Sequence, residues 1–331
     1  MKIKKECPIC GFNELRVISK QKFKSPKGSI EKNKENYDFL RKWILFNKIT
    51  DNPDEIIIKI SFCEKCSFMF SNPRLSEEDV KTKYDNIEKF RIKKPKIFNN
   101  PPKAWNYRMN KIYKLVKKFY NLDQKHNPKV LDYGGASGYM LIPFRDKFDC
   151  YVLDFEEFPL PKGVKYLGRD FNDIENHEKF DVILFQHTLE HVLGINELLG
   201  KIYKFLKEGG IVVIQVPLGC LREWKNLREP LTHINFFSEQ SLYNAVKLAG
   251  LAPIYVKTRF QSPLSKRNWI IDLIAQKGLK DKEKEVKIED VASTAFQKNN
   301  FLYYLPLMIF NLDSLRSGIN RMIRKLFTYI F

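Results

Sequence analysis

The sequence predicts an α/β fold built on a doubly wound, mostly parallel sheet. Lys129–Tyr133 is a short, largely apolar run typical of a buried strand, and Gly134, Gly135 and Gly138 follow it closely. The apolar stretch Tyr139–Phe144 comes next and is expected to be helical. Strand, glycine turn and helix in this order are the nucleotide-binding start of an open, Rossmann-like sheet.

Later apolar runs supply the rest of the predicted sheet. We expect further strands at Cys150–Leu153, at the start of Val164–Asp173, and at Phe180–Gln186, Ile211–Val216 and Pro253–Thr258. We expect helices at Trp105–Tyr120, from Val192 to Lys207 and from Ser238 to Gly250. The pattern leaves a seventh strand unplaced.

Length and composition narrow the class of protein. The chain has 331 residues, of which 44% are hydrophobic, enough for one full-sized domain with appendages. It contains no apolar run of about 18 residues, so a membrane-spanning helix is not expected. The basic start, Met1–Lys5, leads into cysteines rather than an apolar segment, so we expect no signal peptide and a cytoplasmic protein.

The net charge of +19 raises the question of a nucleic-acid partner. Lysines are scattered along the whole chain among many asparagines and isoleucines, which indicates a composition bias. A surface that binds a nucleic-acid groove would concentrate them in a stripe. The charge therefore does not favour nucleic acid as the partner.

Two Cys-x-x-Cys pairs, Cys7 with Cys10 and Cys63 with Cys66, predict a metal centre. Four thiolates close a tetrahedron around zinc and leave no open position, so the expected role is structural. The intervening residues exceed a usual zinc-ribbon loop and are expected to hold a helix at Tyr37–Phe46. Four unligated cysteines remain an alternative. A redox pair is less favoured, because neither pair opens a helix after a strand.

The segment Leu131-Asp132-Tyr133-Gly134-Gly135-Ala136-Ser137-Gly138 resembles motif I of class I S-adenosylmethionine-dependent methyltransferases. Its glycines lack the G-x-G-x-x-G spacing that brings a helix onto a pyrophosphate. Asp132, at the end of the strand, would repel a phosphate but suits a cation. S-adenosylmethionine carries a sulfonium and an ammonium group and no phosphate, so the resemblance and the local chemistry agree.

The resemblance implies a set of residues that contact the cofactor. Asp154 ends the second strand about 20 residues past the glycines, where an acid accepts hydrogen bonds from ribose hydroxyls. Asp170 is the candidate for the adenine amino group, with Phe171 beside the ring and Asp173 as an alternative acid. The complete expected set is Asp132, Gly134, Gly135, Gly138, Asp154, Asp170, Phe171 and Gln186.

Leu189-Glu190-His191 after the fourth strand is a further point of resemblance. Ligands of doubly wound sheets lie at the carboxyl ends of the strands, so this segment is expected where the methyl group is presented. His191 is the first candidate for the base and His233, in the loop after the fifth strand, the second. Glu190 could supply the charge instead, and a structural hydrogen-bonding role for His191 stays open.

The front of the chain narrows the resemblance further. A Cys-x-x-Cys pair, a short apolar run, Asn72-Pro73-Arg74 and a helix begun by Ser76 and Asp79 resemble bacterial methyltransferases with an N-terminal zinc-binding segment. This group is often associated with sugar or surface-glycan modification, which implies a small-molecule substrate such as a nucleotide sugar or glycan precursor. The alternatives are a zinc-containing RNA methyltransferase, which the lack of an Asn-Pro-Pro-Tyr-type motif disfavours, and a non-catalytic zinc- or nucleic-acid-binding protein.

The expected organisation has four parts: a zinc-binding segment at 1–91, a linker and lead-in helix at 92–127, the methyltransferase domain at 128–259 and a mostly helical extension at 260–331. Leu315–Phe331 mixes arginine and lysine with large apolar residues, which suits a basic amphipathic helix on an anionic membrane. Peripheral contact with the inner face of the membrane is one interpretation. Packing on the domain or a dimer contact is the other, and the sequence does not fix the oligomeric state.

Overall fold

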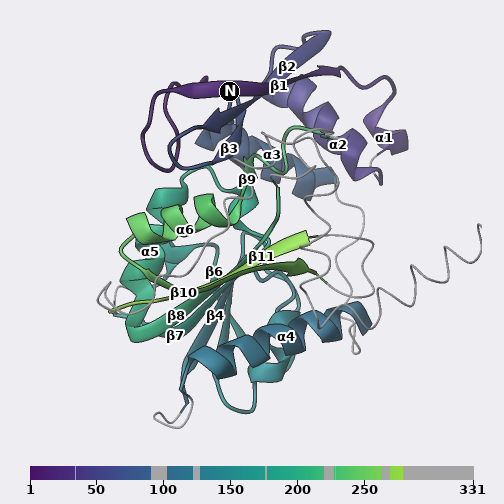
Figure 1. Cartoon of the computed structure of the whole chain (residues 1–331). Coiled ribbons are helices and arrows are strands. Elements are labelled where there is room, and N and C mark those ends of the chain that lie inside the picture. The colour runs from purple at the N-terminus through teal and green to yellow at the C-terminus, as the bar shows by residue number, and fades with distance from the viewer. Residues whose placement is uncertain are drawn as a thin grey trace, which may run out of the picture.

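The computed structural model describes residues 1–33, 35–90, 103–121, 127–175, 177–219, 227, 229–261 and 269–278. Two sheets organise this part of the chain (Figure 1). The linker expected at 92–102 and the extension after residue 278, including the predicted amphipathic helix, lie outside the described residues. No described helix is long and apolar enough to cross a membrane.

The larger sheet has the strand order β10-β11-β8-β7-β4-β5-β6. Its strands are β4 (Lys129–Tyr133), β5 (Asp149–Leu153), β6 (Val164–Gly168), β7 (Phe180–Gln186), β8 (Leu206–Pro217), β10 (Ala252–Phe260) and β11 (Trp269–Gln276). Only β11 runs antiparallel to its neighbours within this sheet. The predicted doubly wound, mostly parallel sheet is thus confirmed.

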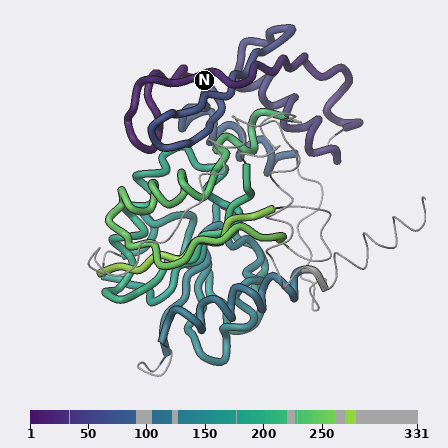
Figure 2. The backbone as a smooth tube through the Cα atoms, in the orientation of Figure 1, coloured from purple at the N-terminus to yellow at the C-terminus, as the bar shows by residue number. Residues whose placement is uncertain are grey.

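Helices cover both faces of this sheet, and its central strands therefore carry apolar residues on both faces. On one face, α4 (Lys103–Phe119) and the short 3-10 helix η3 (Tyr139–Phe144) pack over Val130 and Val182. On the other, α5 (Ile195–Phe205) and α6 (Glu239–Leu248) pack over the next residues of the same strands. Figure 2 traces the backbone in the same orientation, with these helices on either side of the larger sheet.

The smaller sheet comprises β1 (Leu15–Lys24), β2 (Glu55–Cys63), β3 (Met69–Asn72) and β9 (Asn235–Phe236), all antiparallel. Its last strand, β9, comes from the chain between β8 and α6. The strand β9 therefore joins the N-terminal region to the part of the chain that forms the larger sheet. Their cores are also continuous, because Phe68 packs on Phe237 with ring centres 5.3 Å apart.

Helices complete the N-terminal region: α1 (Ile30–Asn33), α2 (Tyr37–Ile44) with the π-helical turn η1 (Leu45–Ile49), and α3 (Glu77–Phe90). The expected capping box begins α3. The Ser76 amide donates to Asp79 Oδ2 at 2.7 Å, and the Asp79 amide donates to Ser76 Oγ at 3.2 Å. The apolar stripe of α2 packs on α3 and on the small sheet.

Two details differ from the sequence prediction. The stretch after the glycine turn forms 3-10 rather than α-helix, and it contains Pro143, which lacks the amide hydrogen of a helical turn. The sheet also continues past residue 259, the expected end of the domain. β11 pairs along β8 and β10 and supplies the seventh strand, where a helical extension was expected.

Candidate active site and four-cysteine centre

The chain turns sharply between β4 and η3. Gly134 and Gly138 have φ values of 71° and 64°, in the left-handed region that favours glycine. A Cβ on Gly135 would lie 2.8 Å from the carboxyl carbon of Asp132, so no side chain fits there. All three glycines of the motif therefore have a physical reason to be glycine.

Asp154, which follows β5, holds this turn in place. The Ala136 amide donates to Asp154 Oδ2 at 2.9 Å, and the Glu156 amide donates to Oδ1 at 3.3 Å. The Tyr166 hydroxyl donates to the Asp154 carbonyl oxygen at 2.9 Å. The carboxylate thus lies between the ends of β4 and β5, where the sequence predicted it.

A cavity of about 640 Å³ opens beside Asp154, between the turns that follow β5 and β6. Aromatic rings and acids share its lining: Phe155, Phe158, Tyr166, Glu156, Glu157 and Asp173. Tyr84 of α3 stacks on Phe155 with ring centres 5.0 Å apart, so the N-terminal region closes one side. Flat rings and hydrogen-bond acceptors in one cavity suit a purine nucleoside.

Two of the expected adenine contacts lie differently. Phe171 is 2% exposed and stacks between Tyr133 and Phe205, with ring centres 5.0 and 4.9 Å away. The Phe171 ring therefore belongs to the core, and its place beside adenine stays a prediction. Asp170 caps the short 3-10 helix η4 (Phe171–Asp173) by accepting from the Asn172 amide at 2.6 Å, and Asp173 is the acid that lines the cavity.

Three polar side chains near the carboxyl ends of β4, β7 and β8 have buried atoms that lack hydrogen-bond partners among the described residues. These are both carboxylate oxygens of Asp132, both amide atoms of Gln186 and Nε of Arg108. Asp132 is 1% exposed, and its pKa is raised to about 8 by burial and by the charge of Asp154, against the opposing charge of Arg108. Buried polar atoms without partners are rare, so they indicate a place where a ligand binds.

Arg108 is a residue that sequence reasoning missed. It extends from α4, and its Nη2 lies 3.5 Å from Gln215 Oε1 on β8. Burial lowers its pKa, the charge of Arg259 lowers it further, and Asp132, Glu190 and Asp272 oppose the change. The sequence does contain a signal for Arg108. Its spacing puts it on one helix face with Trp105 and Ile112. An arginine within an otherwise apolar stripe requires an anionic or polar partner.

The Leu-Glu-His segment forms a second 3-10 helix, η5 (Leu189–His191), after β7. Glu190 is 1% exposed, and neither carboxylate oxygen has a hydrogen-bond partner within the described ranges. The Nδ1 atom of His191 lies 2.7 Å from the Thr232 carbonyl oxygen. Since a carbonyl can only accept, Nδ1 carries the proton and Nε2 is left as an acceptor, 3.8 Å from Glu190 Oε1.

His233 completes the group, with its ring centre 4.9 Å from that of His191. One ligand-type atom from each of Glu190, His191 and His233 can be chosen so that all three lie within 4.8 Å of one another. His187 also approaches, with Nδ1 at 3.3 Å from Glu190 Oε1, while its Nε2 lies 2.9 Å from Gln261 Nε2. We call Glu190, His191 and His233 the Glu-His-His cluster.

Charge within the cluster is balanced locally. Burial alone would raise the pKa of Glu190, but the hydrogen-bonding contact of His187 and the charges of the neighbouring imidazoles bring it below its ordinary value. Burial lowers the pKa of His191, and Glu190 opposes that change. Ionisation of Glu190 therefore depends on the neighbouring histidines, and burial favours the neutral form of His191.

The N-terminal region holds the cluster in position. Arg74 is 1% exposed and donates to the carbonyl oxygens of Val192, Leu193 and Ile234, at 3.3–3.4 Å. Asn235 of β9 donates to the Leu189 and Val192 carbonyl oxygens, both at 2.7 Å. These bonds tie the backbone on both sides of Glu190 and His233 to the small sheet.

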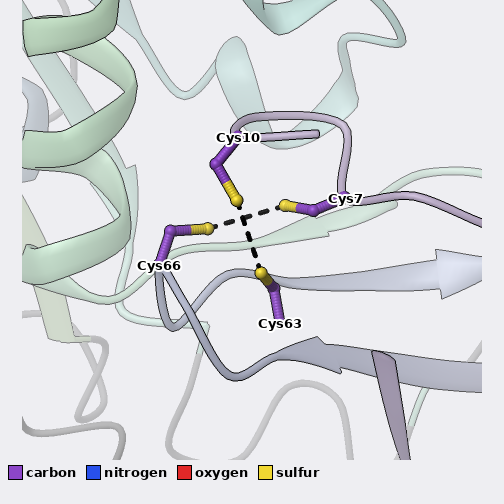
Figure 3. A group of neighbouring side chains, drawn as sticks. All are labelled: Cys7, Cys10, Cys63 and Cys66. Carbon is purple, nitrogen blue, oxygen red and sulfur yellow. Dashed lines mark hydrogen bonds between the residues drawn. The ribbon is translucent and has the colours of Figure 1, made fainter. Parts of the chain in front are cut away.

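The two Cys-x-x-Cys pairs come together as predicted (Figure 3). Cys7 Sγ lies 3.5 Å from Cys66 Sγ, and Cys10 Sγ lies 3.5 Å from Cys63 Sγ. Sulfur atoms about 2.3 Å from a tetrahedral zinc would be about 3.8 Å apart, so the four thiols fit a zinc ion. Each pair sits in a tight turn, with the Gly11 amide bonded to the Cys7 carbonyl and the Ser67 amide to that of Cys63.

Comparison with known families adds an independent observation. Residues 104–256 match a family model described as a methyltransferase domain. The match supports a class I S-adenosylmethionine-dependent methyltransferase. It spans α4, the glycine turn, Asp154 and the Glu-His-His cluster, and it does not reach the cysteines. A search of curated proteins finds no significant match.

Solved structures with a similar fold include several methyltransferases. One is the 1,6-didemethyltoxoflavin N1-methyltransferase of Burkholderia thailandensis, with 13% identity, coverage of 66% of this chain and 96% of that chain, and a TM-score of 0.45. Another, from Methanosarcina mazei, has 13% identity, 51% and 99% coverage and a TM-score of 0.40. Phosphoethanolamine N-methyltransferase 2 of Haemonchus contortus has 16% identity, 53% and 56% coverage and a TM-score of 0.40. These similarities are too distant to assign a substrate.

Proposed function

We propose that this protein transfers a methyl group from S-adenosylmethionine to a small molecule, with a nucleotide sugar or a surface-glycan precursor as the substrate class. The observation that carries the proposal is the buried Asp132 carboxylate at the end of β4, which lacks a partner among the described residues and stands beside a glycine turn. Such a group attracts a cation and repels a phosphate. It is therefore suited to the sulfonium and ammonium groups of this cofactor.

Each part of the cofactor has a matching group. Asp154 would accept from the ribose hydroxyls, and the aromatic and acidic cavity beside it would hold adenine, with Asp173 near the amino group. Asp132 would bind the ammonium group of the methionine portion. The Nε atom of Arg108 would donate to the carboxylate of that same portion. Gln186, at the end of β7, has both a donor and an acceptor to offer to the methionine portion.

The Glu-His-His cluster would serve the acceptor. The charges of both Asp132 and Glu190 act on Arg108, which supports a position of the cluster on the methionine side of the cofactor. S-adenosylmethionine would supply an electrophilic methyl group to an acceptor oxygen, and the electron pair of the broken carbon–sulfur bond would stay on sulfur as a neutral thioether. His191 Nε2, the unprotonated nitrogen, would take the proton of the acceptor hydroxyl. Glu190 would stabilise the resulting imidazolium, with His233 as the second candidate base.

The four cysteines would hold one structural zinc ion, since their donor chemistry and spacing fit a closed tetrahedral site. The zinc would stabilise the N-terminal region, and that region in turn fixes the backbone around Glu190 and His233. The sugar or glycan assignment rests on the resemblance of the front of the chain. A cytoplasmic protein with peripheral membrane contact through its C-terminal segment agrees with that substrate class.

Isothermal titration calorimetry tests the proposal. The wild-type protein should bind S-adenosylmethionine and S-adenosylhomocysteine, and Asp154→Ala should bind both more weakly because the ribose contacts are lost. A dinucleotide such as NAD, which carries a pyrophosphate, should give no heat, since the glycine turn lacks the G-x-G-x-x-G spacing that brings a helix onto a pyrophosphate. Binding of NAD but neither adenosyl compound would contradict the proposal.

A further inference from the structure

We propose that the Glu-His-His cluster is a second metal site, which binds a divalent transition-metal ion through Glu190, His191 and His233. Metal binding and proton acceptance would exclude each other there. The second half of this inference rests on the proposed function, and the first half does not. The cluster differs in kind from the four-cysteine centre, since it offers nitrogen and oxygen donors.

The donor atoms are already gathered. One atom from each of the three side chains lies within 4.8 Å of the others, and His191 Nε2 is 3.8 Å from Glu190 Oε1. Two ligands about 2.1 Å from a tetrahedral ion are about 3.4 Å apart, so small side-chain rotations would close the site. Imidazole nitrogen with a carboxylate oxygen favours zinc, cobalt or nickel over magnesium or calcium.

Glu190 supplies an independent observation. Its carboxylate is buried, and the criteria for a hydrogen bond are met by neither oxygen in the described part of the chain. The nearest donor is His187 Nδ1, 3.3 Å from Oε1, and a buried anion with so few donors is costly unless a cation joins it. The histidines supply only partial compensation while neutral. A bound cation would satisfy the carboxylate directly.

His191 is oriented as metal-ligating histidines usually are. Its Nδ1 donates to the Thr232 carbonyl oxygen at 2.7 Å, which fixes the tautomer and directs the Nε2 lone pair toward Glu190. The backbone on either side is held by Arg74 and Asn235. The site is therefore preorganised, and three protein ligands leave an open coordination position, unlike the closed four-thiolate centre.

Mutual exclusion follows from the shared lone pair. His191 Nε2 can accept the acceptor's proton or bind a metal ion, but not both at once. An ion at the cluster would remove the proposed base. Excess transition metal should then inhibit methyl transfer without displacing S-adenosylmethionine, whose proposed contacts lie at Asp132, Arg108 and Asp154.

Cobalt(II) titration of the full-length, zinc-loaded protein tests the metal site. A second ion should bind and give weak visible absorption bands without the sulfur-to-metal charge-transfer band of thiolate ligation. His233→Ala and Glu190→Gln should each weaken this binding by more than about tenfold, since even outer-shell partners of metal ligands contribute about 10–100-fold. His177→Ala, at an exposed histidine, is the matched control and should bind as wild type does. An unchanged affinity for S-adenosylhomocysteine, measured by calorimetry, verifies that each variant is folded.

Two results would overturn the metal site: no second cobalt ion bound by wild type, or equal binding by His233→Ala and wild type. Once an acceptor is known, excess zinc should inhibit transfer, and a mild chelator that leaves the four-cysteine zinc in place should restore it. Faster transfer with the added ion would overturn the exclusion. Cobalt binding in a protein that methylates no acceptor would support the metal site and count against the proposed function, so the two failures are distinguishable.

Discussion

The four-cysteine centre and the Glu-His-His cluster are built in opposite ways. The cysteine centre is closed: its four sulfur atoms face one another, and local turns set the spacing within each pair. The Glu-His-His cluster keeps a buried carboxylate without hydrogen-bond partners among the described residues and an imidazole nitrogen that can still accept. A site that satisfies its own groups adds stability, whereas a site that leaves groups unsatisfied can bind or react.

The two sites are nevertheless linked. Asn196, in α5, donates to the Ile9 carbonyl oxygen at 2.7 Å, inside the first cysteine turn. Arg74 and β9 carry the connection from the small sheet to the backbone around Glu190 and His233. The closed centre thus supports the open one. Loss of the four-cysteine centre should damage both sites, while loss of the Glu-His-His cluster should leave the four-cysteine centre intact.

The largest expected effect comes from breaking the closed centre. Cys66→Ser should lose zinc and most of the folding free energy of the N-terminal region, because structural zinc binding contributes about 10–16 kcal/mol in small zinc domains. Elemental analysis should find about one zinc per wild-type chain and much less in the variant, and calorimetric unfolding should lose its cooperative transition. Cys150→Ser is the control, since Cys150 is buried away from the centre. If metal-free Cys66→Ser folds and melts like the wild-type protein, zinc has no structural role at this centre.

Breaking the open cluster should spare the fold. His191→Ala should lower turnover by roughly 10²–10⁴-fold with nearly unchanged cofactor affinity, because only the proton acceptor is removed. His177→Ala, which alters an exposed histidine, should keep wild-type turnover. Steady-state kinetics and calorimetry are measured together. If His191→Ala and His233→Ala both turn over like wild type, neither histidine is the base, and Glu190 or a tyrosine takes its place as candidate.

Sequence reasoning succeeded where a feature is local. The glycine turn, Asp154 at the next strand end and the cysteine pairs are each encoded within a few residues, and the structure places them as predicted. It failed where the decisive neighbour is distant in sequence. The partner of His191 Nδ1 lies 41 residues away, and the antiparallel strand β11 follows a segment with no helical or strand pattern.

Phe171 and Arg108 both show that sequence position alone does not predict the surroundings of a side chain. Phe171 was expected at the cofactor, and Arg108 was not. Phe171 occupies an expected cofactor position in the sequence, but in the fold its ring is buried and stacks on those of Tyr133 and Phe205. Arg108 looks like one basic residue among 58, and only the folded chain brings it near Asp132 and Glu190. Side-chain environment, rather than position along the chain, decides both.

Asp132 sharpens the comparison through pH, since its role depends on an unsatisfied charge. Asp132→Asn should weaken S-adenosylmethionine binding by about 10–100-fold, as expected for loss of a charge-assisted hydrogen bond worth about 1.5–3 kcal/mol. Burial raises the pKa of Asp132 to about 8, so below that pH the carboxyl is neutral and must release a proton before it binds a cation. Wild-type affinity should therefore rise with pH up to about 8, by at most about tenfold per unit. Calorimetry at several pH values should show this slope in wild type and not in Asp132→Asn. An equal slope in both would assign the titration to another group.

Substitution of Arg108 should give the smallest effect on cofactor affinity. It distinguishes contacts to the methionine portion of the cofactor from contacts to its adenosine. Its guanidinium would bind the methionine carboxylate, which S-adenosylmethionine and S-adenosylhomocysteine share. Arg108→Gln should therefore weaken both by about the same factor, roughly tenfold for one hydrogen bond to a charged group. Lys114→Gln removes an exposed positive charge from the same helix and should leave both affinities unchanged, which excludes a general field effect. Adenosine, which lacks the amino-acid portion, should bind Arg108→Gln and wild type equally. A loss of adenosine affinity would mean that Arg108 supports the packing of α4 over the site instead of contacting the carboxylate.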